Sequence, residues 1–133
     1  MSLLIGIHIN EALAKSEAIV KRVGDRVFPI VTPAGVEEYP YIVYQSVMGE
    51  PERTKDGVVS DNVTTTITVV SKSYGEAIAI AYEVRRALDD VEEYYDKFDV
   101  FNAEYTGGSE AWLDDIAAYA IDLGFSFQTS ANE

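Results

Sequence analysis

Apolar residues recur at helical spacing in the first part of the chain, over residues 4–23. The spacing predicts one amphipathic helix or two short helices broken near Ser16, whose side chain is suited to capping a helix start. Gly24 follows directly and is expected to end the helical segment, because glycine adopts the left-handed conformation there without strain. The apolar members of the series are Ile5, Ile9, Leu13, Ile19, Val20 and Val23.

A proline-rich approach then leads into an apolar strand. Residues 27–31 are expected to be extended, at a sheet edge or in a connection, and a turn is expected at residues 33–35. Pro40 favours extended backbone at the preceding residue, and its missing amide proton costs little at the start of a strand. We therefore expect a strand from Tyr41 to Met48.

Residues 49–62 are polar and contain Pro51 and Gly57. They are longer than the usual hairpin connection of about two to five residues, so they predict a projecting arm. Beyond them, residues 63–69 alternate between apolar residues and threonine, which predicts a half-buried strand rich in β-branched residues.

A second amphipathic helix is predicted from residue 74 to about residue 89. Ser73 and Glu76 have the spacing of a capping box, which satisfies free amide groups at a helix start. Residues 89–99 hold six acidic residues and one lysine, so we expect a solvated linker there. The apolar stripe of the helix consists of Ala77, Ile78, Ala81, Val84, Ala87 and Leu88.

The last third of the chain alternates again, over residues 101–105 and 119–128, and predicts two more strands with a turn at residues 107–109. The order of helices and strands predicts a single α+β domain over residues 1–133. We expect a mostly antiparallel four- to five-stranded sheet with two main helices packed on one face.

Composition narrows the function classes. The chain carries 23 acidic and 10 basic residues, a net charge of −13, and its basic residues are scattered. Tight nucleic-acid binding is therefore disfavoured, since it depends on clustered Lys and Arg. The absence of cysteine excludes a disulfide, a thiolate zinc site and a cysteine nucleophile. The longest apolar runs are far shorter than the ~20 residues of a membrane helix, so we expect no membrane partner.

Candidate chemistry is sparse. His8 is the single histidine and has no partner at a recognisable spacing, so we expect it to be structural or at the surface. Adjacent acidic pairs, at residues 37–38, 89–90, 92–93 and 114–115, point apart on helices and strands and are expected to be solvated. We predict no catalytic residue, no metal site and no cofactor, and therefore no enzyme. The nine tyrosines suggest contact surfaces instead.

The order of elements and one local pattern resemble a known family, the tail completion or tail terminator proteins of long-tailed bacteriophages. The resemblance covers roughly residues 10–90. It rests on "VGDRVFPIVTPAGVEEYPYIVYQSV" (23–47), the threonine-rich strand "DNVTTTITVVSKS" (61–73) and the helix "YGEAIAIAYEVRRALDD" (74–90). The final strand "AYAIDLGFSFQT" (118–129) lies in the expected place.

The resemblance implies a structural virion protein, made in the bacterial host cytoplasm, in the tail or neck of a phage or prophage particle. It implies a homo-oligomeric ring, expected to be a hexamer, that terminates the tail tube and contacts the tube protein and the neck or connector protein. DNA would pass through the lumen without specific binding. We expect the oligomer interface to include Arg53, Lys55, Val58, Val59, Tyr41, Tyr44, Arg85 and Arg86.

Two other functions remain open from the residues alone. A small soluble ligand-binding α+β module would contain a preformed apolar pocket with a few converging polar groups. A divalent-metal-dependent hydrolase would need several of the carboxylates to converge on an ion. Thermal shifts with and without divalent ions would separate the second function from a ring protein.

Overall fold

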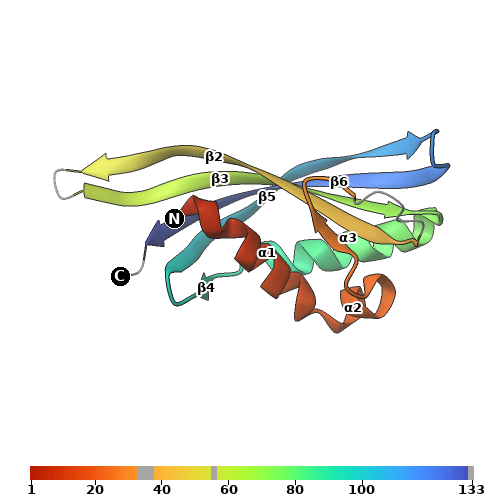
Figure 1. Cartoon of the computed structure of the whole chain (residues 1–133), viewed down its shortest axis with the longest axis horizontal. Helices are drawn as coiled ribbons and strands as arrows, with labels where there is room; N and C mark the ends of the chain where they lie inside the picture. The colour runs from red at the N-terminus through yellow and green to blue at the C-terminus, as the bar shows by residue number, and fades with distance from the viewer. Residues whose placement is uncertain (33–37, 55–56, 132–133) are drawn as a thin grey trace.

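The computed structural model describes the backbone of residues 1–32, 38–54 and 57–131 and, except at residues 52, 54 and 57–59, their side chains. A long sheet carries its helices on one face (Figure 1). The turn expected at residues 33–35 lies outside the described residues. In chain order the elements are η1 (Ser2–Leu4), α1 (Ile5–Ala14), α2 (Glu17–Val23), β1 (Val27–Pro29), β2 (Tyr41–Thr54), β3 (Gly57–Ser71), α3 (Tyr74–Leu88), β4 (Glu93–Tyr94), β5 (Phe98–Leu113) and β6 (Ala118–Ala131).

The strands form one mixed sheet of six, in the order β1-β2-β3-β6-β5-β4. Strand β1 runs parallel to β2, and every other neighbouring pair is antiparallel. The α+β class is confirmed, but the expected four- to five-stranded, mostly antiparallel sheet has to be corrected. The four long strands are the predicted ones, and β1 lies in the segment 27–31 expected to be extended at an edge or in a connection. Strand β4, of two residues, is too short to produce a sequence pattern.

The first helical segment breaks where the sequence predicts. Ser16 is extended, and its Oγ accepts a hydrogen bond from the amide of Ile19 at 3.4 Å, so it caps α2. Gly24 follows α2 with a φ of 64°, the left-handed region that favours glycine. The sheet face thus carries three α-helices in the described part of the chain instead of two.

Helix α3 begins with half of the predicted capping box. The Ser73 side chain accepts a hydrogen bond from the amide of Glu76. The Glu76 carboxylate does not reach back to Ser73; it accepts a hydrogen bond from Ser71 Oγ at 3.0 Å and forms an ion pair with Arg22 of α2 at 3.5 Å. The start of α3 is therefore tied both to the end of β3 and to α2.

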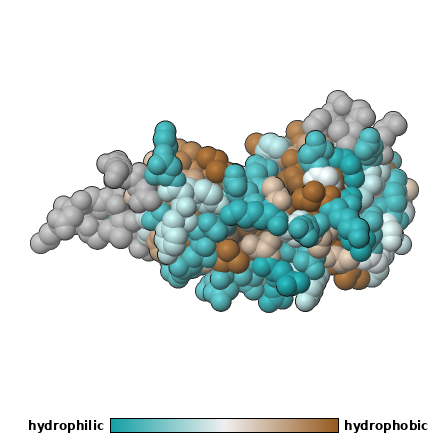
Figure 2. All heavy atoms as spheres, turned by 90° about the horizontal axis from the view of Figure 1, so that it is seen from below, coloured by the Kyte–Doolittle hydropathy of each residue, from teal (hydrophilic) through white to brown (hydrophobic). Residues whose placement is uncertain are grey.

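The main core lies between the helices and the sheet. Alternate residues of β3 and β6, including Ile67 and Phe125, are buried against the apolar faces of α1 and α3. A second, smaller cluster lies on the other face of the sheet, where Tyr41, Val70 and Ala120 are buried together. Apolar residues on the helical face form separate patches among hydrophilic ones (Figure 2).

Two long hairpins extend past the helices at opposite ends of the sheet (Figure 1). The predicted arm at residues 49–62 is not a polar loop, because β2 continues to Thr54 and β3 begins at Gly57. Their pairing shifts register between Met48 and Pro51 and again between Glu52 and Arg53. The arm is therefore an irregular β-hairpin that projects from the body.

Two connections differ from the sequence prediction. Residues 107–109 belong to β5, next to a register shift, and the turn between β5 and β6 lies at residues 114–117. Gly107 has a φ of 125°, and a Cβ on Gly108 would collide with the carbonyl oxygen of Asp122, so these glycines serve a bulge and a close approach of two strands.

The expected solvated linker at residues 89–99 also needs correction. It contains β4 and the first residues of β5. The carboxylate of Asp89 accepts a hydrogen bond from the amide of Tyr105 at 2.9 Å, and the amide of Asp90 donates to the carbonyl of Ala103 at 2.9 Å. These contacts attach the acidic segment to the edge of β5.

Candidate oligomer interface

The predicted interface residues on the arm are only partly described. Arg53 lies in β2 and is exposed. Val58 and Val59 lie in β3, where their backbone alone is described, and Lys55 lies outside the described residues. The structure thus places three of these residues on the projecting hairpin.

Arg85 and Arg86 are exposed on α3, but both already have partners within the subunit. Arg85 forms an ion pair with Asp89 at 3.4 Å, and its guanidinium lies 4.2 Å from the ring centre of Tyr105. Arg86 forms an ion pair with Glu83 at 3.5 Å. Such exposed pairs contribute about 0–1 kcal/mol each, so the guanidinium groups remain able to contact a neighbour.

Tyr41 and Tyr44 are buried inside the subunit, with exposed fractions of 6 % and 8 %. The Tyr44 hydroxyl accepts a hydrogen bond from Asn10 Nδ2 at 2.7 Å, and the Tyr41 ring packs 5.4 Å from that of Tyr39. These contacts use the side chains within the fold. They leave little tyrosine surface to a neighbouring subunit, and a contribution of the two residues to an interface stays a prediction.

Other apolar side chains, absent from the expected set, are exposed. Tyr74, Ile78 and Tyr82 follow one another at four-residue spacing on the outer face of α3, and Trp112 lies near the end of β5. The helical spacing was visible in the sequence, but it was read as a single buried stripe that included Ile78. The remaining exposed large apolar residues are Met1, Leu3, Ile7, Val20, Ile30, Val31, Val47, Met48 and Tyr94.

His8 is fully buried in α1. Its Nδ1 lies 2.8 Å from the hydroxyl of Tyr95, and its Nε2 has no hydrogen-bond partner. Burial lowers the pKa of His8 to about 4; the carboxylate of Glu93 opposes this shift and the ammonium of Lys15 adds to it. Burial also raises the pKa of the Tyr95 hydroxyl to about 12. The imidazole is therefore neutral at pH 7 and packs as a core side chain, the structural role that the sequence suggested.

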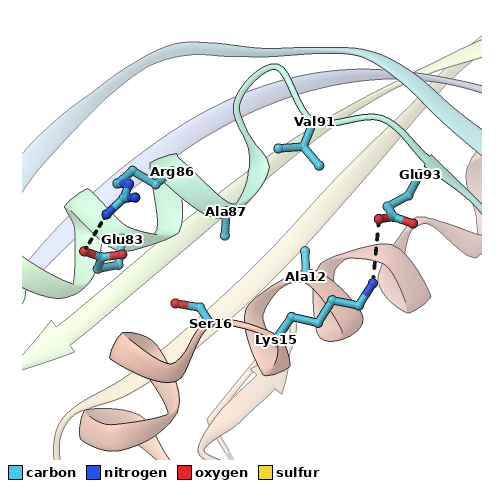
Figure 3. Close-up of a pocket in the computed structure, with 8 residues that line it drawn as sticks. All are labelled: Ala12, Lys15, Ser16, Glu83, Arg86, Ala87, Val91 and Glu93. Atoms are coloured by element: carbon cyan, nitrogen blue, oxygen red, sulfur yellow. Dashed lines mark hydrogen bonds and ion pairs between the residues drawn. The ribbon is translucent and has the colours of Figure 1, made fainter.

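A shallow pocket of about 270 Å³ lies between α1, α3 and the segment before β4 (Figure 3). Its charged groups form two ion pairs. Lys15 of α1 pairs with Glu93 of β4 at 3.6 Å, and Arg86 pairs with Glu83 on α3. Ser16 also lines the pocket, but its hydroxyl caps α2. Within the described residues no three His, Asp or Glu side chains gather in a way that could hold a metal ion. The prediction that the chain is no enzyme stays a prediction.

At both edges of the sheet, part of a long strand has no strand paired with its outer side. Strand β1 covers β2 only at Ile42–Tyr44, so in the described part of the chain the outer edge of β2 has no strand beside it from residue 45 to residue 54. On the other side, β4 and the acidic segment cover β5 only up to Tyr105. Open backbone edges of this kind accept a further strand.

No helix of the described chain has the length and apolar character that crossing a membrane requires. The expected absence of a membrane partner is a separate matter and stays a prediction.

The fold is found in solved structures of other proteins, two of which are as follows. One is a chain of the virion of a native gene transfer agent particle, with a TM-score of 0.73 and 17 % identity over 93 % of this chain and 92 % of that chain. The other, described only by a sequence identifier, has a TM-score of 0.63 and 12 % identity over 87 % of this chain and 93 % of that chain. At these identities the likeness concerns the fold.

Sequence comparison identifies the family directly. No curated protein matches the chain. The family model described as "Tail completion protein gp17", however, matches residues 8–114, which include most of α1, all of α2 and α3, and five of the six strands. The chain therefore belongs to the tail completion protein gp17 family and is a structural protein of a phage-type tail.

Proposed function

We propose that the chain assembles as a ring, with six subunits as the expected number, that closes the end of the tail tube and joins it to the neck of the particle. Two features support this proposal. The chain belongs to the tail completion family, and its sheet has an open strand edge on each side. A ring needs two different contact surfaces on each subunit, so that every copy binds the next in a head-to-tail manner.

The strand directions favour such an arrangement. The four long strands β2, β3, β6 and β5 are consecutive in the sheet, and each is antiparallel to the next. Because their number is even, β2 and β5 run in opposite directions. A neighbouring copy that places its β5 beside β2 would continue the antiparallel order, the arrangement that hydrogen bonds satisfy most readily.

The charge of the chain suits passage of DNA without binding. The net charge of −13 opposes contacts with phosphate. On the sheet face away from the helices, the side chains of β3 and β6 are mainly small and neutral, such as Thr64, Thr66, Ser126 and Gln128, with Asp122 as an acidic exception. A surface of this kind gives DNA no cluster of cations to bind.

The experiment is to measure the mass of the purified chain by light scattering over a wide concentration range, alone and mixed with purified tail tubes. We expect a ring-sized species in at least one condition, and electron micrographs that show extra density at a single end of each tube. The proposal is wrong if the chain stays monomeric in both conditions and does not sediment with the tubes.

A further inference from the structure

The two sides of the subunit differ in charge. Residues 5–29, which form α1, α2 and β1, hold four basic residues (Lys15, Lys21, Arg22, Arg26) and three acidic ones (Glu11, Glu17, Asp25), a net charge of +1. Residues 98–131, the β5–β6 hairpin, hold six acidic residues and no Lys or Arg. Strand β1 lies at one edge of the sheet, and β5 lies beside the opposite edge strand (Figure 1).

The acidic side carries exposed aromatic rings at the end of the hairpin. The indole of Trp112 is half exposed and lies 4.9 Å from the ring of Tyr119, which in turn lies 5.4 Å from the ring of Tyr74. The indole N–H donates to Asp114 at 3.0 Å, and the Tyr74 hydroxyl donates to Glu110. We call these five residues the aromatic end.

The carboxylates at this end of the β5–β6 hairpin form no ion pair with the described residues. They are those of Glu110, Asp114 and Asp115. The ammonium of Lys72 lies at this end, but it donates to backbone carbonyls of the β5–β6 turn. Exposed Trp and Tyr beside unpaired acids form a surface suited to an apolar and basic partner.

The opposite side of the same chain has these complementary properties. A groove of about 540 Å³ lies between α1, α2 and β1. Its walls are mainly apolar and include Leu13, Ile19, Val20 and Val27, and the polar side chains of Asn10 and Asp25 also line it. Val20 is 42 % exposed at the groove. The next residue, Lys21, is exposed and forms no ion pair with the described residues.

We propose that the aromatic end of one copy docks into the α1–α2–β1 groove of the next copy, with Trp112 as the anchor and Asp114 near Lys21. The proposal rests on the ring proposed above and specifies which surfaces meet in it. Aromatic anchors that fill an apolar pocket dominate the binding free energy of many interfaces. Opposite charges around such an anchor set its orientation and exclude the wrong pairing.

The same observations disfavour a symmetric contact between like surfaces. Two aromatic ends would bring their unpaired carboxylates together, and two grooves would leave each other unfilled. Docking of end into groove is heterologous, so each copy uses both surfaces and a closed ring results when the rotation between copies fits.

The cysteine-free sequence allows a direct test by cross-linking. The double variant Lys21→Cys/Asp114→Cys carries one thiol on each surface and is treated with a short bismaleimide at a concentration where the chain self-associates. We expect a ladder of covalent oligomers. Each single variant is expected to give no oligomers, because the two thiols of a contact belong to different surfaces. The matched control Lys21→Cys/Tyr94→Cys, with its second thiol on the exposed side of β4, is also expected to give no ladder.

A second variant measures the anchor. Trp112→Ala is expected to raise the concentration needed for assembly by about tenfold or more, while its circular dichroism and Tm match those of the wild type. If the wild type forms rings but the double variant gives no ladder, the ring stands and the proposed contact is wrong. Covalent dimers of either single variant would indicate a symmetric contact, and they would also overturn the proposed docking of the aromatic end into the groove. If light scattering finds no self-association either alone or with tail tubes, the chain does not sediment with the tubes and no ladder forms, both proposals fail.

Discussion

Acidification is expected to destabilise the folded subunit through the buried imidazole of His8. Its pKa is about 4 in the folded chain, whereas an unfolded histidine has a pKa of 6.5. As the pH falls, the unfolded chain therefore takes up the proton first, and protonation favours unfolding. The stability that the neutral imidazole provides is complete above pH 6.5 and is lost between pH 6.5 and pH 4. Below pH 4 this group causes no further loss.

The size of the effect follows from the two pKa values. Proton linkage lowers the free energy of unfolding by about 2 kcal/mol at pH 5 and by about 3 kcal/mol at pH 4, relative to its value at pH 7. A domain of this kind has a free energy of unfolding of roughly 5–15 kcal/mol, so the loss is a large share. The geometry explains why the folded state resists protonation: Nε2 has no acceptor nearby, and the ring is enclosed by the rings of Tyr95 and Phe127.

The assay is urea unfolding followed by circular dichroism at several pH values between 7 and 4. His8→Asn is the matched control, because its side-chain amide can either accept a hydrogen bond from the Tyr95 hydroxyl or donate one to it, but does not titrate. All carboxylates contribute equally in both proteins. We expect the wild type to lose about 3 kcal/mol more than the variant over this range. Parallel curves for the two proteins would refute the reasoning.

Three further predictions concern single elements. Gly108→Ala is expected to lower the free energy of unfolding by about 1–3 kcal/mol, because the new Cβ meets the backbone of β6. The control Gly75→Ala places its Cβ in open space on α3 and is expected to cause no such loss in urea unfolding. Ser73→Ala is expected to cost about 0.5–2 kcal/mol through loss of the α3 cap, and the exposed Ser109→Ala is its control; equal Tm values would contradict this. Replacing residues 50–59 by Asn-Gly is expected to weaken assembly but leave Tm nearly unchanged; unaltered assembly in light scattering would exclude an arm contact.

The long elements were predictable because their burial is periodic. Alternation over residues 63–69 and 119–128 identified β3 and β6, each of which has one face on the core. Helices α2 and α3 were identified by their caps, since Ser16 and Ser73 both hold the amide of the third residue after them. In each case one local rule and the tertiary packing agree.

Strand β4 and the interface were not predictable in the same way. Strand β4 has two residues, and its position depends on hydrogen bonds to β5, which no local pattern encodes. Tyr41 was expected at the oligomer interface because tyrosine is enriched in contact surfaces, but the second apolar cluster covers its side chain within the subunit. The Gly107-Gly108 pair resembled a turn because bulges and turns require the same backbone freedom. Which aromatic residues remain exposed depends on the complete fold.

The edge strands of the sheet connect the fold with the proposed assembly, because they differ in how well they are protected against pairing with another strand. Soluble monomers protect edge strands with bulges, charges or proline, and β2 does so beyond Met48, where the register shifts and Pro51 occur. Residues 45–48 of β2 contain no bulge, charge or proline, and residues 109–113 of β5 contain a single charge, Glu110. Exposed Val47 and Trp112 lie within these two stretches. These stretches contribute little to the subunit's own core, so substitutions there should change assembly without changing folding. Substitutions at Ile67 or Phe125 should do the reverse, because both are fully buried. We therefore expect mutations to change assembly and stability separately in this protein.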